Sequence, residues 1–169
     1  MFRDYLRLIT FTGGLLVGVQ LPSFVDQYEK RVDAHYVEAQ LNFAGFQATA
    51  DRYFGGDVEA MLRHHDQSSD LVFQDEAKAI RSIWQRLQML KAEQAAMNQD
   101  FVRQVYHLLA NANTELRNET RSAYSYTVLL TMEAIASGIA GGFVTAFSVE
   151  LVVLFLGVLF LPGPRARRV

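Results

Sequence analysis

The hydrophobic pattern divides the chain into two apolar ends and a polar middle. The stretch Leu8–Val25 holds no charged residue, and Tyr126–Leu161 holds only Glu133 and Glu150. The region Asp26–Ser125 between them holds 15 Asp and Glu and 11 Lys and Arg residues. A soluble globular domain does not usually separate its charges in this way. We therefore expect an integral membrane protein whose middle region faces water.

The first apolar stretch, Leu8–Val25, is 18 residues long and follows Arg3 and Arg7. A helix of about 17–25 apolar residues can cross the hydrocarbon core of a bilayer, so this stretch is long enough to span it. A basic start before an apolar run is also typical of a cleaved signal peptide. No small-x-small cleavage site follows within residues 21–25. We interpret residues 1–25 as an uncleaved transmembrane anchor.

The second apolar stretch, Tyr126–Leu161, is about twice as long as one crossing requires. In one arrangement Phe143–Leu161 crosses the bilayer and Tyr126–Gly142 extends the same helix outward. In the alternative, Gly141 and Gly142 turn a tight hairpin of two short membrane segments. The segment before the glycines is short and contains an acidic residue. This favours a single crossing with an extension.

Arginines at both ends of the chain predict its orientation. Arg3 and Arg7 precede the first apolar stretch, and residues 162–169, which begin Pro-Gly-Pro and hold three arginines, follow the second. Because basic residues concentrate on the cytoplasmic side of membranes, we expect both termini in the cytoplasm. Two crossings then place residues 26–125 in the periplasm of a bacterial inner membrane. A hairpin at residues 141–142 would add a third crossing.

The middle region carries two series of apolar residues at alternating three- and four-residue steps, which indicate helices packed against other helices. The first series runs from Val25 to Tyr53 and ends before Gly55 and Gly56. Asp57 is a suitable N-cap for a short helix that reaches His65. The polar residues 67–70 then break the chain.

The second series runs from Phe73 to Leu116 and passes Asn98 without a change of phase. We expect the two series to form an antiparallel, coiled-coil-like helical hairpin outside the membrane. The predicted fold class is therefore an all-α membrane protein with an N-terminal and a C-terminal transmembrane helix. The aromatic residues of both series are interpreted as core rather than as ligands of a bound molecule.

Glu150 is the membrane residue most suggestive of chemistry. It lies about 16 Å along a helix from the C-terminal end of its apolar stretch, near the middle of a bilayer. A carboxylate at that depth is costly unless it is protonated, paired or facing water. Gln20 reaches a similar depth if the two anchors are antiparallel. We expect Gln20 and Glu150 to form a polar contact that fixes helix register, with proton or ion conduction by Glu150 as the alternative.

Small residues recur at four-residue spacing in both apolar stretches. Gly14 and Gly18 form one such pair, and Gly138 and Gly142 form another. Small residues at this spacing let the backbones of membrane helices approach closely. We expect these glycines to mediate packing between the two anchors or between subunits.

Composition removes several function classes. The chain has no cysteine, which excludes disulfides and thiol catalysis, and its net charge of −2 is not that of a nucleic-acid-binding domain. The sequence His64-His65-Asp66 is a weak metal signal, because adjacent histidines on a helix point about 100° apart. No nucleotide-binding, nucleophile or metalloprotease motif is present. We therefore expect no catalytic residues, metal or cofactor.

Two segments resemble a known family. They are Leu21-Pro22-Ser23-Phe24-Val25-Asp26-Gln27-Tyr28 and Ala44-Gly45-Phe46-Gln47-Ala48-Thr49-Ala50-Asp51-Arg52-Tyr53-Phe54-Gly55-Gly56. They are similar to small proteobacterial inner-membrane proteins that are classified as a domain of unknown function. The resemblance covers nearly the whole chain and implies a bacterial inner membrane, with no assigned activity.

These observations predict a structural or interaction protein of the inner membrane, not an enzyme. We expect it to self-associate or to be a subunit of a larger envelope assembly, with the lipid bilayer as its surroundings. The alternative is a small proton- or ion-translocating component that uses Glu150.

Overall fold

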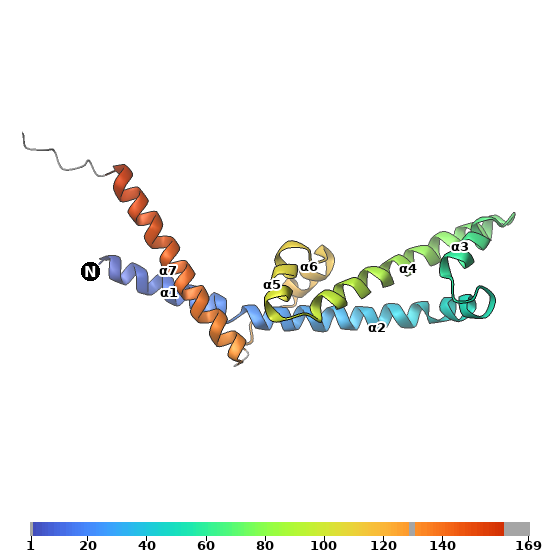
Figure 1. The fold of residues 1–169 in the computed structure, drawn as a ribbon, viewed down its shortest axis with the longest axis horizontal. Helices are drawn as coiled ribbons and strands as arrows, with labels where there is room; N and C mark the ends of the chain where they lie inside the picture. The colour runs from blue at the N-terminus through green and yellow to red at the C-terminus, as the bar shows by residue number, and fades with distance from the viewer. Residues whose placement is uncertain (1, 129–130, 161–169) are drawn as a thin grey trace, which may run out of the picture. The chain divides into compact units, whose positions relative to one another are not determined.

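The computed structural model describes residues 2–128 and 131–160, which form seven helices and no strand (Figure 1). The helices are α1 (Phe2–Gly18), α2 (Leu21–Tyr53), α3 (Val58–Asp66), α4 (Leu71–Met97), α5 (Phe101–Ala110), α6 (Thr114–Ser122) and α7 (Met132–Phe160). The predicted all-helical class is confirmed for these residues. The predicted stop and basic tail, residues 162–169, lie outside the described residues.

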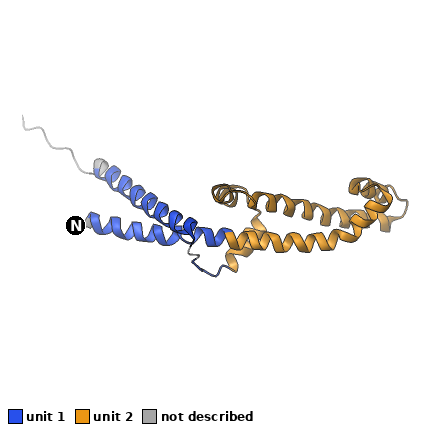
Figure 2. Ribbon diagram, turned by 60° about the horizontal axis from the view of Figure 1, so that its bottom comes forward, with its two compact units in different colours: residues 1–25, 124–169 blue, residues 26–123 orange. Residues whose placement is uncertain are grey.

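The chain forms two compact units (Figure 2). Unit 1 comprises residues 1–25 and 124–169, and unit 2 comprises residues 26–123. Unit 1 therefore contains both apolar stretches, and unit 2 contains the charged middle. The unit boundaries fall within two residues of the changes in charge along the sequence.

A short break at Val19 and Gln20 separates α1 from α2. Pro22 explains it, because proline has no N–H for the carbonyl of Gly18 four residues earlier and its ring crowds that carbonyl. The Gln20 N–H donates instead to the Val17 carbonyl at 3.1 Å. The first apolar stretch is therefore built from α1 and the start of α2.

Helix α7 runs without interruption through Gly141 and Gly142. The alternative in which these glycines turn a hairpin is therefore wrong. The helix also begins later than predicted, at Met132, where the Thr131 hydroxyl accepts a hydrogen bond from the Ala134 N–H at 3.2 Å. Tyr126 is not helical and has a φ of 52°, so the predicted extension does not reach back to it.

The first half of unit 2 follows the predicted order of elements. Helix α2 ends at Tyr53, and Gly55 and Gly56 then adopt φ values of 59° and 85°, which favour glycine. The Asp57 side chain accepts a hydrogen bond from the Ala60 N–H at 2.9 Å and caps α3. Asp70 caps α4 in the same way, through the Val72 N–H. The predicted break at residues 67–70 is confirmed.

The second predicted helix is divided into α4, α5 and α6. Asp100 interrupts the predicted helix. Its side chain accepts a hydrogen bond from the Arg103 N–H at 3.2 Å and so caps the start of a new helix, α5. The Gln104 amide donates to the Met97 carbonyl at 2.5 Å, which satisfies one of the free carbonyls at the end of α4. Asn113 caps α6 through two backbone N–H groups. The capping residues therefore divide the region into separate helices, although its apolar residues keep a regular helical spacing throughout.

Within unit 2, α4 returns along α2 in the opposite direction (Figures 1 and 2). Tyr28 near the start of α2 contacts Glu93 near the end of α4. Towards the other end, one apolar core joins α2, α3 and α4; its buried members are Phe43, Ala50, Val58, Met61, Leu62, Ala77 and Ile80. Between these two regions the helices leave a cleft of about 530 Å³, lined on α2 by residues 35–42 and on α4 by residues 82–86.

Candidate functional site

Glycines set the contact between α1 and α7 in unit 1. A Cβ atom at Gly14 would lie 2.0 Å from the Thr145 hydroxyl and 2.5 Å from the Gly141 carbonyl oxygen. A Cβ atom at Gly18 would lie 2.3 Å from the Ser137 carbonyl oxygen. These distances are too short for any side chain. The two backbones therefore approach as closely as glycine permits; small-residue contacts between membrane helices have the same geometry.

The α7 side of the contact is built in the same way. A Cβ atom at Gly138 would lie 2.5 Å from the Val19 side chain, and one at Gly142 would lie 2.7 Å from the ring of Phe11. The structure therefore places all four glycines singled out in the sequence at the α1–α7 contact. The Thr145 hydroxyl adds a polar link, since it lies 3.0 Å from the Thr10 carbonyl oxygen of α1.

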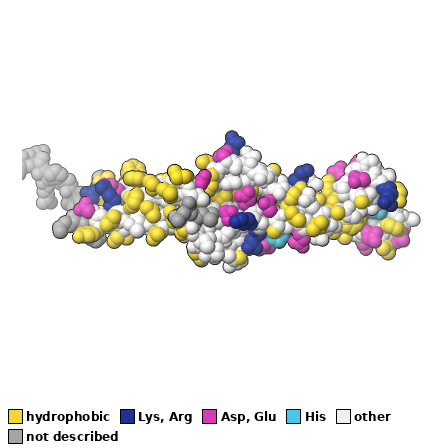
Figure 3. All heavy atoms as spheres, turned by 90° about the horizontal axis from the view of Figure 1, so that it is seen from below, with side chains coloured by type: hydrophobic (Ala, Val, Ile, Leu, Met, Phe, Trp, Pro, Cys, Tyr) yellow, Lys and Arg dark blue, Asp and Glu magenta, His cyan; other side chains and the backbone are white. Residues whose placement is uncertain are grey.

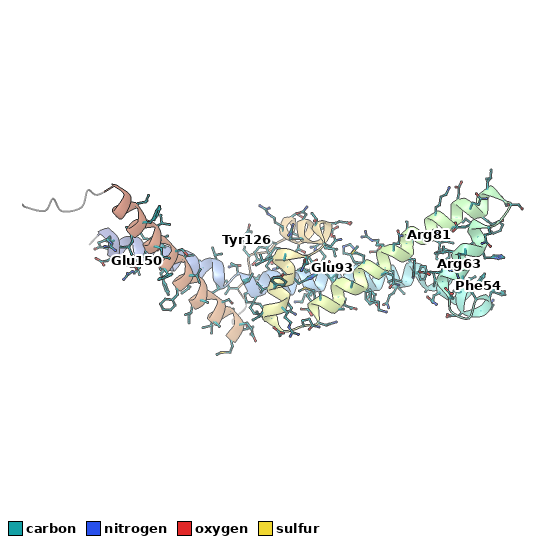
Figure 4. All side chains as sticks on the ribbon, turned by 45° about the horizontal axis from the view of Figure 1, so that its top comes forward. Phe54, Arg63, Arg81, Glu93, Tyr126 and Glu150 are labelled. Atoms are coloured by element: carbon teal, nitrogen blue, oxygen red, sulfur yellow. The ribbon has the colours of Figure 1, made fainter. Side chains whose placement is uncertain are left out.

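Glu150 lies on α7 next to the basic start of α1 (Figure 4). Its carboxylate accepts a hydrogen bond from the Arg7 guanidinium, and Arg3 lies 3.5 Å from it. The Glu150 side chain is 31% exposed, whereas those of Arg7 and Arg3 are about twice as exposed. The acidic group is therefore part of an ion pair at the edge of the helix contact, which lowers the cost of placing it in a membrane.

The predicted contact between Gln20 and Glu150 is not formed. Gln20 instead accepts a hydrogen bond from the Tyr124 hydroxyl at 2.7 Å. The prediction aligned the helices by the ends of their apolar stretches, but the glycine contact sets a different register. In that register Arg7 lies beside Glu150, and Gln20 lies near the other end of the pair.

An aromatic and polar group gathers at the end of unit 1 near Gln20. The ring of Tyr124 lies 5.3 Å from that of Phe24 and 4.8 Å from that of Tyr126. The buried Ser23 hydroxyl lies 3.2 Å from the Thr127 hydroxyl. Tyrosine has an apolar ring and a polar tip and is enriched where proteins cross from lipid to water. The two ends of unit 1 are therefore chemically distinct from the glycine contact between them.

Unit 2 contains a buried carboxylate, Glu93, which is 7% exposed (Figure 4). It accepts hydrogen bonds from the Tyr28 hydroxyl at 2.7 Å and from the Asn113 N–H at 3.0 Å. The His107 Nε2 atom lies 2.9 Å from the same carboxylate. Residues of α2, α4 and α5 and the cap of α6 therefore meet at one acidic side chain. Burial, and then the bonded carboxylate, raise the pKa of Tyr28 well above its usual value.

Sequence reasoning missed the Glu93 cluster. The predicted apolar series on α4 continued from Leu90 to Gln94 and Met97. The structure buries Leu90, Glu93 and Met97, which have the same three- and four-residue spacing. An acidic residue at an inward-facing helical position is the signal that could have revealed the cluster. Its partners could not be predicted, because they depend on the turn after Met97.

A second acidic site in unit 2 joins α2 to α6. The Glu119 carboxylate lies 3.0 Å from the His35 Nε2 atom and 3.4 Å from the Arg31 guanidinium. The hydrogen bond with His35, together with the nearby charges of His35 and Arg31, lowers the pKa of Glu119. The site therefore favours an ionised carboxylate.

The residues of the weak metal signal have other partners. The rings of His64 and Phe54 lie 5.6 Å apart, and the ring of His65 stacks on that of Phe73 at 5.7 Å. Asp66 forms a 2.5 Å ion pair with Arg81. Among residues 2–128 and 131–160, no three His, Asp or Glu side chains are arranged to hold a metal ion.

Two helical segments in the described part of the chain are long and apolar enough to cross a membrane. They are Arg3–Tyr53, which includes the break between α1 and α2, and Met132–Gly157. Of the most apolar 18 residues, 22% are buried in the first segment and 11% in the second. A core helix of a soluble protein would bury most of these residues. The surface of unit 1 is correspondingly rich in apolar side chains (Figure 3).

Comparison with known families identifies the chain. Residues 2–161 match the model of the family described as Protein of unknown function (DUF2937), and the chain belongs to this family. No curated protein and no solved structure matches it. The resemblance inferred from the sequence is confirmed at the level of this family.

Proposed function

We propose that this DUF2937 protein is an integral membrane protein in which unit 1 lies in the bilayer and unit 2 lies in water. Its role is structural or interactive rather than enzymatic. The observation that carries the proposal is the exposure of the apolar side chains of α7. Eleven of them are 43–77% exposed: Met132, Ile135, Ile139, Phe143, Val144, Phe147, Leu151, Val152, Leu154, Phe155 and Leu156.

Water would penalise such a surface strongly. Full burial of one Leu, Val or Phe side chain contributes about 1.5–3 kcal/mol, so transfer of these groups to lipid contributes on the order of 10 kcal/mol. Charged groups are sparse on the same helix, where residues 134–149 contain none. The surface of unit 2, in contrast, carries charges throughout (Figure 3). A lipid environment accounts for this difference.

The dimensions of unit 1 fit a bilayer. The uncharged residues 8–25, divided between α1 and the start of α2, cover about 27 Å at the rise of a helix, close to the thickness of the hydrocarbon core. Arg3 and Arg7 lie at one end of this stretch, and the Tyr124 and Tyr126 rings lie at the other. Basic and aromatic residues are those that anchor helices at lipid–water boundaries. The Arg7–Glu150 pair lies at the end of the uncharged stretch of α1, and the apolar residues of α7 continue beyond it.

The arginines also support an orientation. We place both termini in the cytoplasm of a bacterial inner membrane, and unit 2 in the periplasm as an extramembrane helical hairpin. An uninterrupted α7 supports two crossings rather than three. The close α1–α7 contact and the exposed apolar surface of α7 support assembly with further copies or with another membrane protein.

The chain contains no cysteine, so single-cysteine variants test this topology directly. A cysteine at the exposed Gln85 of α4 should react with an impermeant maleimide in intact spheroplasts. A cysteine at Phe147, in the proposed lipid-facing surface, should not react even after lysis. Reaction of Phe147→Cys to the same extent as Gln85→Cys would contradict the membrane placement of α7. Labelling of Gln85→Cys only after lysis would reverse the orientation.

The proposed assembly needs a separate measurement. The mass of the protein purified in mild detergent, corrected for bound detergent, should exceed that of one chain or include a co-purifying membrane protein. A single chain with no partner would contradict self-association and the subunit role together. The alternative function, proton or ion translocation through Glu150, is tested by the substitution described in the Discussion.

A further inference from the structure

Helix α5 has one wide apolar face, and only part of that face packs within unit 2. Its inner face packs within unit 2, where Leu108 is buried and Phe101 and Val105 are partly buried. Its outer face carries Val102, Tyr106 and Leu109, which are 75%, 67% and 72% exposed. These three residues are spaced by four and three positions and form one stripe. Arg103, Gln104 and His107 occupy the other side, so α5 is an amphipathic helix whose apolar face is only partly covered by unit 2.

The neighbouring helix α6 shows what a solvated outer face looks like in the same unit. Its exposed residues are all polar: Thr114, Glu115, Asn118, Arg121 and Ser122. The two helices are of similar length and follow one another in the chain. The apolar stripe of α5 is therefore a local feature and not a general property of the short helices of unit 2.

Helix α5 is attached to the beginning of α2. His107 of α5 and Tyr28 of α2 both contact the buried Glu93 carboxylate. Tyr28 follows Val25, the last residue of the uncharged stretch, by three positions within the same helix, or about 4.5 Å of helix rise. The part of α2 that holds α5 thus follows directly after the proposed lipid boundary.

We infer that α5 lies at the lipid–water interface, with Val102, Tyr106 and Leu109 inserted among the lipid headgroups and the upper acyl chains. This inference rests on the proposed membrane placement of unit 1 and adds a second lipid contact. Amphipathic helices of this kind lie in the plane of the interface with their apolar face buried about 5–10 Å deep. Arg103, which pairs with Asp100 at 3.2 Å and is exposed beside the stripe, is placed to contact phosphates while Tyr106 occupies the interfacial layer.

The chemistry of the stripe favours lipid as its occupant. Val102, Tyr106 and Leu109 form a narrow convex strip on one short helix. A partner protein usually requires a larger surface, since specific interfaces bury about 800 Å² on each side. Insertion into lipid requires only an apolar stripe with a basic or aromatic edge.

Single nitroxide labels on the full-length protein in lipid vesicles test the inference. Labels at V102C, Y106C and L109C should collide with oxygen several-fold more often, relative to a water-soluble nickel chelate, than a label at L41C. Leu41 is the matched control, because it is an equally exposed leucine (72%) on α2 of the same unit. A label at N118C on α6 should behave like the Leu41 label. Circular dichroism of each labelled variant should match that of the parent protein.

A label at F147C separates this inference from the proposed function. If the Phe147 label prefers oxygen and the α5 labels behave like Leu41, α5 is in water and only the inference is wrong. If the α5 labels are shielded from both reagents, a protein surface covers the stripe, and the inference is again wrong. If the Phe147 label itself collides mainly with the nickel chelate, the proposed membrane placement of unit 1 is wrong, and the inference about α5 loses its basis.

Discussion

Units 1 and 2 are both built from helices, but they bury opposite kinds of side chain. In unit 1 the smallest residues lie inside the α1–α7 contact, and large apolar side chains such as Phe143 and Phe147 lie outside. In unit 2 large apolar side chains such as Phe43 and Met61 lie inside, and most of the outer surface is polar. Water drives the second arrangement by the hydrophobic effect. The first has no such force in water and is typical of helices that pack in lipid.

The comparison extends to the acidic groups. Glu93 of unit 2 is buried, and both of its carboxylate oxygens accept hydrogen bonds, as a buried polar group requires. Glu150 of unit 1 lies at the edge of its helix pair and is bonded to an arginine. The two carboxylates should therefore differ greatly in their importance for stability.

The largest effect is expected from Glu93→Ala. This substitution leaves the Tyr28 hydroxyl, His107 and the Asn113 N–H without their acceptor inside unit 2. The free energy of unfolding should fall by about 3–5 kcal/mol, as when one partner of a buried polar network is removed. Thermal unfolding followed by circular dichroism in mild detergent measures the change. Glu76→Ala, at an exposed position of the same helix, is the control, and an equal effect of both substitutions would contradict a central role for Glu93.

The next largest effect is expected from Gly18→Ala in unit 1. The added Cβ would lie 2.3 Å from the Ser137 carbonyl oxygen, so the helices must separate. A loss of about 1–3 kcal/mol is expected, in line with other overpacked contacts. Gly13→Ala is the matched control, since a Cβ there meets nothing within 4 Å. If the two variants unfold at the same temperature, glycine packing does not hold α1 against α7.

A smaller, pH-dependent effect is expected from Glu119→Gln in unit 2. Because His35 and Arg31 lower the pKa of Glu119, the ionised carboxylate stabilises the fold above its ordinary pKa. That contribution is lost as the pH falls through the lowered pKa. The stability difference between parent and variant should therefore be present near pH 6 and disappear on acidification below the lowered pKa. A difference that persists there would show that the ionisation of Glu119 is not its source; Glu76→Gln controls for the general loss of one charge.

The smallest effect is expected from Glu150→Gln. Glutamine can still accept a hydrogen bond from Arg7, and an exposed ion pair contributes little to stability. Assembly in detergent and thermal unfolding should change little. Reconstituted vesicles provide the contrast with the alternative function. A proton or ion flux that is present for the parent and abolished in the variant would favour translocation over a structural role.

Local signals allowed much of the fold to be predicted. Gly55 and Gly56 marked the end of α2, and Asp57 marked the start of α3, because these residues act through their own backbone conformation or their own side chain. Pro22 and Asp100 carried equally local information, but the apolar phase around them is uninterrupted and concealed the breaks. Where a capping residue or a proline stands within a continuous series of apolar positions, the sequence pattern alone does not show whether the helix breaks there.

The site residues were less predictable because they depend on register. The four packing glycines were recognised from their spacing, but the pairing of Glu150 requires knowing which glycines face each other. Alignment by the ends of the apolar stretches placed Gln20 beside Glu150, and the glycine contact places Arg7 there instead. The Glu93 cluster joins side chains of α2, α4 and α5 with the cap of α6, and it was not predicted at all.

The central claim is that unit 1 is inserted in lipid, and alkaline extraction tests it most directly. Membranes from cells that produce the full-length protein are washed with carbonate and sedimented at high speed without detergent. The account predicts that the protein stays in the pellet and is released only by detergent. Recovery of the intact, folded chain in the supernatant would contradict the account, because the apolar surface of α7 would then have to be covered by protein.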